Sequence, residues 1–114
     1  MTLTDIYEHL WKGKKCKIMV QKIIYKTKDY CKVKFTFGTD NAERIEIFGL
    51  NNNWQMPLKM KKRKDGKFIA ETNLPKGSSH EFKYLVNQTE WLNDDDADRE
   101  VPNMYGGTNG VIEL

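Results

Sequence analysis

The stretch CKVKFTF, residues 31–37, alternates apolar side chains with lysines and a threonine. Successive side chains of a β-strand point to opposite faces, so this period of two predicts a strand with one face in a core. Turn signals such as Asp65-Gly66 separate it from further short segments with strand patterns. These segments are residues 44–50, 58–62, 67–74, 81–87, 90–93 and 111–114. The sequence therefore predicts an all-β fold, an antiparallel β-sandwich.

The chain before residue 27 has a different pattern. Residues 4–12 predict a short helix, with apolar residues at helical spacing between Thr4, which can cap it, and Gly13, which ends it. Residues 14–26 are ambiguous, because a strand-like alternation is lost at positions 23–25. We divide the chain into an N-terminal extension, residues 1–26, and one sandwich module, residues 27–114.

The 114 residues carry a net charge of +3 that is unevenly distributed. Residues 1–34 hold nine lysines against three acidic residues, whereas residues 65–114 hold ten acidic residues against four basic ones. The basic run KMKKRK, residues 59–64, is one possible nucleic-acid patch. It leads into the Asp65-Gly66 turn, however, and solvated side chains at a loop tip explain it at least as well. We therefore expect no nucleic-acid partner.

The sequence also bears on cellular location. No segment approaches the roughly 18 apolar residues of a membrane span, and the first ten residues lack the apolar core of a signal peptide. We therefore expect a cytoplasmic protein with no membrane partner. Cys31 falls on the buried side of its strand pattern and Cys16 lies among lysines, so we expect no disulfide between them in a reducing compartment.

A second informative stretch is FGLNNNWQMPL, residues 48–58. Asparagine amides both donate and accept hydrogen bonds, and the indole of Trp54 offers a flat apolar face with one N–H. Neutral amides beside an indole suit an uncharged ligand rich in hydroxyls, such as a sugar. The alternative is an ordinary turn, in which the asparagines adopt left-handed conformations and Trp54 folds back onto the sheet.

Two more residues extend this candidate site. If residues 81–87 alternate as predicted, Lys83 points away from the core, and Trp91 follows the next turn beside the exposed end of that strand. Trp54, Lys83 and Trp91 then offer two indole faces and one long donor on the same outer surface, as in a shallow sugar site. In the alternative reading, Lys83 is a solvated lysine and Trp91 covers the edge of the core.

Several motifs follow one another in the order found in a known family. They are GLNNNW at 49–54, MPL at 56–58, DGKF at 65–68, LPKG at 74–77, EFKYLV at 81–86, WLND at 91–94 and GTN at 107–109. Together they resemble the family 48 carbohydrate-binding modules, the isoamylase N-terminal-like early-set domains. That family includes the glycogen-binding domain of the AMP-activated protein kinase β subunit. The resemblance covers roughly residues 30–114.

The resemblance implies an immunoglobulin-like sandwich that binds α-glucans such as glycogen or starch. By the family pattern, Trp54 and Trp91 match the two stacking tryptophans. Lys83 matches the lysine that bonds sugar hydroxyls, and Asn109 matches the asparagine near the C-terminal strand.

Two further candidates complete the expected carbohydrate site. Tyr105 falls where the kinase module has a leucine that threads a glucan ring, so the resemblance implies an aromatic contact there. Asn53 is expected to bond sugar hydroxyls from the turn before Trp54. The chain departs from the family at Leu50-Asn51, where members usually have aspartate or serine and then phenylalanine.

No catalytic, metal or cofactor site is predicted. Five carboxylates crowd residues 94–100, but glycoside hydrolysis needs two at a defined separation, and a solvated acidic loop is the simpler interpretation. His9 and His80 have no cysteine partner at metal-binding spacing. We therefore predict a non-catalytic α-glucan-binding module. The alternative is a protein-interaction domain that has lost glycan binding and uses residues 1–22 for a partner or for self-association.

Overall fold

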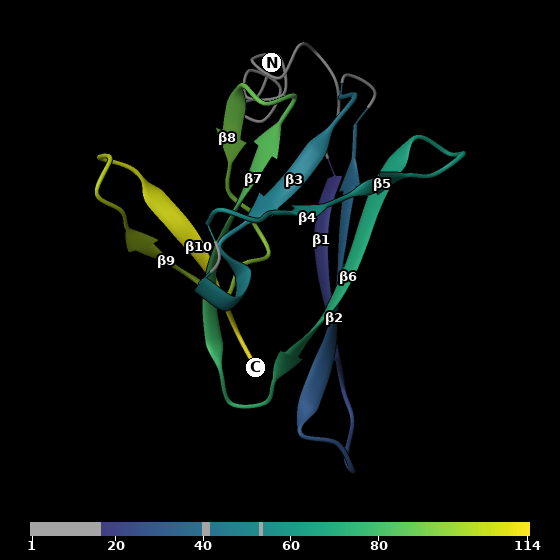
Figure 1. Ribbon diagram of the computed structural model, residues 1–114, viewed down its shortest axis with the longest axis vertical. Coiled ribbons are helices and arrows are strands. Elements are labelled where there is room, and N and C mark those ends of the chain that lie inside the picture. Colours follow the sequence, from purple (N-terminus) through teal and green to yellow (C-terminus); the bar gives the residue numbers. More distant parts are fainter. Residues whose placement is uncertain (1–16, 40–41, 53) are drawn as a thin grey trace, which may run out of the picture.

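The computed structural model describes residues 17–39, 42–52 and 54–114, which form two antiparallel sheets (Figure 1). The first sheet has the order β1 (Lys17–Ile24), β2 (Tyr30–Gly38), β6 (Lys67–Pro75), β5 (Lys61–Lys62). The second has the order β4 (Leu58–Lys59), β3 (Ile45–Phe48), β7 (Ser79–Val86), β10 (Thr108–Glu113), β9 (Arg99–Pro102), and β8 (Glu90–Leu92) also pairs with β7. The predicted β-sandwich is confirmed, whereas the helix predicted at residues 4–12 lies outside the described residues.

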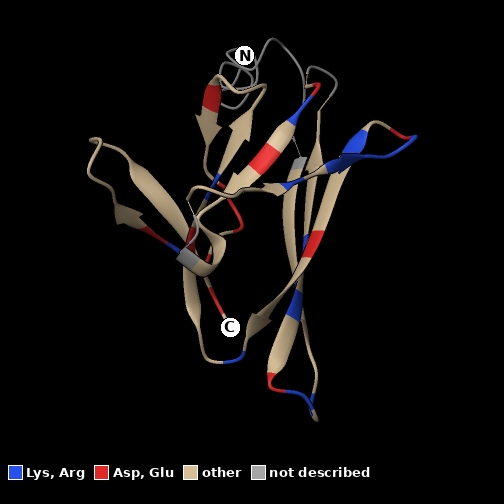
Figure 2. Ribbon diagram, viewed as in Figure 1, with Lys and Arg blue, Asp and Glu red and all other residues tan. Residues whose placement is uncertain are grey.

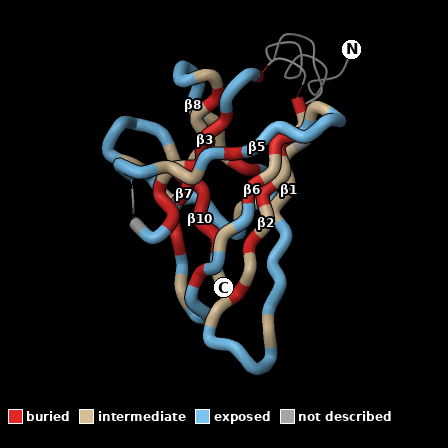
Figure 3. Tube along the Cα trace, turned by 45° about the vertical axis from the view of Figure 1, so that its right-hand side comes forward, coloured by how far each residue is buried: buried red, intermediate tan, exposed pale blue. Residues whose placement is uncertain are grey.

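The core lies between the two sheets, where the buried segments of the chain face one another (Figure 3). Strand β2 contributes every second side chain, as its alternation predicted, and Phe35 and Phe37 are fully buried. Strand β7 does the same from the other sheet with Phe82 and Tyr84. The ring of Tyr84 meets that of Phe37 edge to face, with centroids 5.4 Å apart. Such pairs add directional packing to the burial of apolar area.

The residues that the sequence left ambiguous include a strand. Strand β1 pairs with β2 along its whole length, from Lys17 opposite Gly38 to Ile24 opposite Cys31. Its inward side chains at positions 18 and 20 pack against the core. No helix in the described part of the chain is long and apolar enough to cross a membrane.

Two local predictions were wrong. No strand was predicted between residues 93 and 111, but this stretch contains β9 and the first residues of β10. Pairing with β10 holds β9 in place, and no apolar alternation marks it. Residues 58–62 were predicted as one strand, but they change sheets: β4 pairs with β3, and β5 pairs with β6. The buried Met60 sits at the crossing, and its N–H donates to the carbonyl of Ile45 at 3.0 Å.

An ion pair joins β1 to the segment that leads into β9. Lys22 Nζ lies 2.6 Å from Asp98 Oδ2, and the backbone N–H of Glu113 donates to the same oxygen at 2.6 Å. Burial acts to raise the pKa of Asp98, but the bonds from Lys22 and from Glu113 outweigh it and lower that pKa. Strand β1 therefore contacts both sheets.

The acidic segment at residues 94–100 was predicted to be solvated, but its first residue is buried. Only 2% of Asp94 is exposed, and its Oδ2 accepts a hydrogen bond from the Tyr84 hydroxyl at 2.6 Å. The other oxygen, Oδ1, accepts the N–H of Asp96 at 2.8 Å. Burial raises the pKa of Asp94, while these two bonds act to lower it. Asp94 thus ties the segment after β8 to the centre of the core.

Tyr84→Phe tests this buried bond. The substitution keeps the ring and removes one donor from a buried carboxylate, so we expect the free energy of unfolding to fall by about 1–3 kcal/mol. Urea denaturation measures it. Tyr105→Phe is the matched control. Because 88% of Tyr105 is exposed, the free energy of unfolding of this variant should equal that of the wild type. Equal stability of Tyr84→Phe and the wild type would show that the bond contributes nothing.

Candidate functional site

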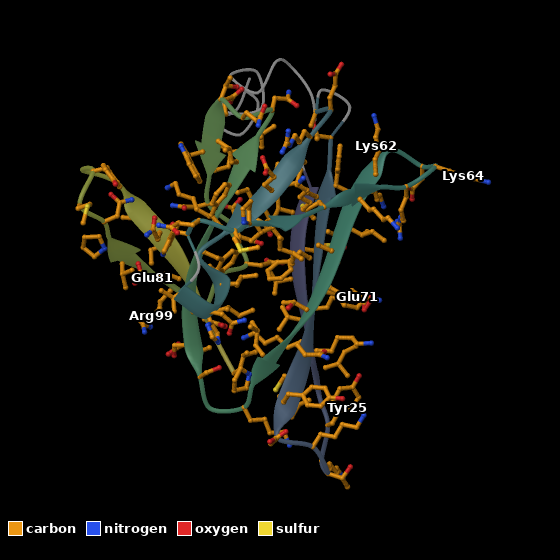
Figure 4. The ribbon with its side chains drawn as sticks, in the orientation of Figure 1. Tyr25, Lys62, Lys64, Glu71, Glu81 and Arg99 are labelled. Carbon is orange, nitrogen blue, oxygen red and sulfur yellow. The ribbon has the colours of Figure 1, made fainter. Side chains whose placement is uncertain are left out.

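The outer face of the second sheet carries a groove of about 870 Å³, within the size range of ligand pockets. Its walls come from the end of β3, the turn before β4, strand β7, the start of β8 and the hairpin of β9 and β10. Figure 4 labels Glu81, which lies on this sheet, away from Glu71 and Lys62 of the other. The lining residues are Phe48, Trp54, Glu81, Lys83, Trp91, Pro102, Asn103, Met104, Tyr105, Gly107 and Asn109.

The groove brings together five of the six residues that the sequence predicted for a carbohydrate site. They are Trp54, Lys83, Trp91, Tyr105 and Asn109. The sixth, Asn53, lies outside the described residues. The contact of these side chains with sugar stays a prediction.

Trp54 rests on the backbone at Gly49. A Cβ atom built on Gly49 would lie 2.6 Å from Cζ2 of the indole and 2.4 Å from the carbonyl oxygen of Glu81. A side chain at position 49 would therefore occupy the place of the indole. Packed this way, Trp54 still has 39% of its surface exposed. It folds back onto the sheet, as the turn interpretation proposed, and lines the groove as well.

Trp91 lines the groove from the short strand β8. It pairs with Leu85 of β7, and its ring packs against Phe48 with centroids 5.1 Å apart and planes at 64°. Phe48 covers one side of the indole, and 48% of the Trp91 surface remains exposed. Both tryptophans thus have one supported side and one accessible part.

Lys83 lies between the tryptophans, and most of its donors are already in use. Its Nζ donates to Asn93 Oδ1 at 3.0 Å and to the Thr108 carbonyl at 2.6 Å. Burial lowers the pKa of Lys83, and the negative charge of Glu100 acts in the opposite direction. An ammonium group has three N–H bonds, so one is left for a ligand.

Three side chains that line the groove are joined by hydrogen bonds. Asn109, which is 8% exposed, donates from Nδ2 to Glu81 Oε1 at 3.1 Å. Asn103 donates from Nδ2 to Asn109 Oδ1, also at 3.1 Å. The Oδ1 atom of Asn103 accepts the N–H groups of Tyr105 and Gly107 at 2.9 and 3.1 Å. These bonds hold the hairpin tip, where 88% of Tyr105 is exposed.

Sequence reasoning missed five side chains of this groove. Phe48 was read only as part of the strand before the asparagines. Glu81 could have been found, because it lies two positions before Lys83 and a strand puts both on one face. Pro102, Asn103 and Met104 gave no signal, since their place depends on β9, where no strand was predicted.

The groove offers a sugar-like ligand apolar faces, one spare ammonium donor and neutral amides. Within the described residues, no group of three or more histidines, cysteines, aspartates and glutamates could hold a metal ion. The family model described as the glycogen recognition site of AMP-activated protein kinase matches residues 31–114. The chain belongs to this family. No curated protein matches it.

Membership in the glycogen-recognition family confirms the resemblance seen in the motifs, and the matched region contains every residue that lines the groove. It supports carbohydrate binding as the general function of the module, in a family whose members are typically non-catalytic. Strand β1 precedes the matched region, which begins with the first buried residue of β2.

A buried histidine holds the turn that leads to Trp54. The N–H of Asn51 donates to His80 Nδ1 at 3.2 Å, so this nitrogen carries no proton. The neutral ring therefore has its proton on Nε2, which lies 2.8 Å from Ser78 Oγ. Asn51 itself has a φ of 59°, a left-handed conformation that asparagine tolerates. Burial lowers the pKa of His80 below its ordinary value of 6.5.

The stability of the module should depend on pH through His80. Because its folded-state pKa is lowered, the unfolded chain binds a proton more readily, so stability falls as pH decreases through 6.5. We expect the free energy of unfolding of the wild type to drop more between about pH 7 and pH 5 than that of His80→Gln. Urea denaturation at both pH values measures it. An equal drop in the free energy of unfolding in both proteins would contradict this role. The other histidine, His9, is present in both proteins and so cannot cause a difference between them.

Gly49→Ala should destabilise the module and displace Trp54. Gly49 has a φ of 100°, and its new Cβ would overlap Trp54 and the Glu81 carbonyl. We expect the free energy of unfolding to fall by at least about 2 kcal/mol, with a shift in tryptophan emission. Gly66→Ala is the control, because Gly66 also has a positive φ but has no atom within 4 Å of its Cβ position. Equal losses in both variants would mean that conformational strain alone acts at Gly49.

Proposed function

We propose that this module binds α-glucan chains, such as those of glycogen or starch, without cleaving them. The observation that carries the proposal is the placement of two half-exposed tryptophans, Trp54 and Trp91, on either side of Lys83 in one groove. Sugar rings present C–H faces that pack on indoles, and their hydroxyls both donate and accept hydrogen bonds. A neutral polymer of glucose therefore matches the chemistry of the lining.

Each side chain has a proposed role. Trp54 and Trp91 stack on glucose faces, and Tyr105 adds a third aromatic contact from the hairpin tip. Lys83 gives its remaining N–H to a sugar hydroxyl. Asn109 is held by its bonds to Glu81 and Asn103, and presents its remaining donor and acceptor capacity in a fixed orientation. Asn53 is proposed to bond hydroxyls from the turn.

The groove suits binding better than hydrolysis. Of the described residues that line it, Glu81 alone carries a carboxylate, whereas hydrolysis by an acid and a second carboxylate needs two. An open site that binds through a few stacked rings is expected to be weak. We expect a Kd between about 10 μM and 1 mM, or roughly −7 to −4 kcal/mol.

A protein-interaction role is the second candidate, and one observation favours it. Strand β1 lies at the edge of the first sheet, and its Ile23 and Ile24 are 39% and 63% exposed. An open edge with apolar side chains can pair with another chain. This surface is on a different sheet from the groove, so both functions can coexist.

Tryptophan fluorescence titrations test the proposed ligand. We expect a saturable change with maltoheptaose and with β-cyclodextrin, and none with cellohexaose. Trp54→Phe and Trp91→Phe assign the signal, and Trp11→Phe, outside the described residues, is the matched control. A lack of response to every sugar, together with failure to sediment with glycogen, would favour the protein-interaction function.

Trp54→Ala should lose glycogen binding while the module stays folded. Loss of one stacking surface worth about 1.4 kcal/mol weakens Kd tenfold, and we expect at least that loss in a co-sedimentation assay. The thermal midpoint should fall only modestly, because Trp54 packs over Gly49 but 39% of its surface is exposed. Ile24→Ala, which removes an exposed apolar side chain outside the groove, should bind as the wild type does. An unfolded Trp54→Ala protein would identify Trp54 as a core residue instead.

A further inference from the structure

The groove contains a negative charge that sugar binding does not require. Glu81 is an exposed residue in the lining, and its Oε1 accepts the hydrogen bond from Asn109. Among the described residues, no side chain or backbone group donates to its Oε2, and no lysine or arginine forms an ion pair with it. One carboxylate oxygen therefore remains available to whatever occupies the groove.

The nearby positive charges do not offset this carboxylate. Lys83 keeps its positive charge while it bonds to the neutral oxygens of Asn93 and Thr108, but the negative charge of Glu100 acts on it. Arg99, which Figure 4 shows near Glu81 on the same sheet, forms an ion pair with Glu113 at 3.4 Å. The charge of Glu100 thus balances that of Lys83, Glu113 balances Arg99, and the carboxylate of Glu81 is left as an excess negative charge.

We propose that Glu81 makes the groove selective for uncharged glucan chains over chains that carry phosphate or other anionic groups. The inference rests on the proposed function, α-glucan binding, and names the class of glucan that the site accepts. The carboxylate accepts hydrogen bonds from sugar hydroxyls and repels an anion placed at the same position. Glu81 is therefore a specificity-determining residue.

The expected size of the effect follows from electrostatics. A phosphate monoester carries about −1.5 to −2 charges near neutral pH. The groove is open to water, so repulsion from one carboxylate at about 4–6 Å is moderate, and we expect about tenfold weaker binding of an anionic glucan at low ionic strength. Salt at about 1 M shortens the Debye length to about 3 Å and should remove most of this difference.

Three β-cyclodextrins of equal ring size test the proposal. One is neutral, one carries phosphate groups at its C6 positions, and one carries amino groups there. We expect the wild type to bind the phosphorylated ring about tenfold more weakly than the neutral ring at low salt, and the amino ring at least as tightly as the neutral ring. Calorimetry measures the three dissociation constants.

Glu81→Gln keeps the acceptor for Asn109 and removes the charge. The dissociation constants of this variant for the three rings should therefore be similar to one another. Glu71→Gln is the matched control, because it removes the same charge from the outer face of the other sheet (Figure 4) and should leave the order unchanged. Equal affinity of the wild type for the neutral and phosphorylated rings would overturn the selectivity alone. No binding of the neutral ring would overturn α-glucan binding, and the selectivity with it.

Discussion

The period of two along β7 is the constraint on which both the core and the groove depend. Phe82, Tyr84 and Val86 point into the sandwich and are fully buried. Glu81 and Lys83, which alternate with these residues along the strand, point the other way and line the groove. A slip of one residue in the pairing of β7 would exchange the two sets and place charges in the core. The packing of the core therefore fixes the register of the groove.

The groove is built from side chains that are held before any ligand arrives. Lys83 is bound by Asn93 and Thr108, and Asn109 is bound by Glu81 and Asn103. Trp54 packs over Gly49, and Trp91 packs against Phe48. Fixing these groups in the free protein reduces the entropy that binding would otherwise cost. The same bonds use up donors and acceptors, which leaves each polar residue only a small capacity for a ligand.

Much of the fold was visible in the sequence, because one buried face imposes an alternation that can be read directly. Residues 31–37 and 81–87 are the clearest cases, and both form central strands. Strand β9 was invisible, since it is an edge strand with only its third residue half-buried. The tryptophans and Lys83 were found from residue chemistry and from the family motifs. The bond from Asn51 to His80 spans 29 positions, and no local pattern signals it.

Basic residues gather on the hairpin of β5 and β6, as Figure 2 shows. That hairpin and the groove belong to different sheets. Strand β1, which the family model does not reach, completes the sheet that carries the hairpin and reaches across to Asp98 through Lys22. A fragment trimmed to the matched residues would expose an unpaired edge of β2 and the apolar side chains beneath it. The sandwich thus contains one strand more than the matched region covers.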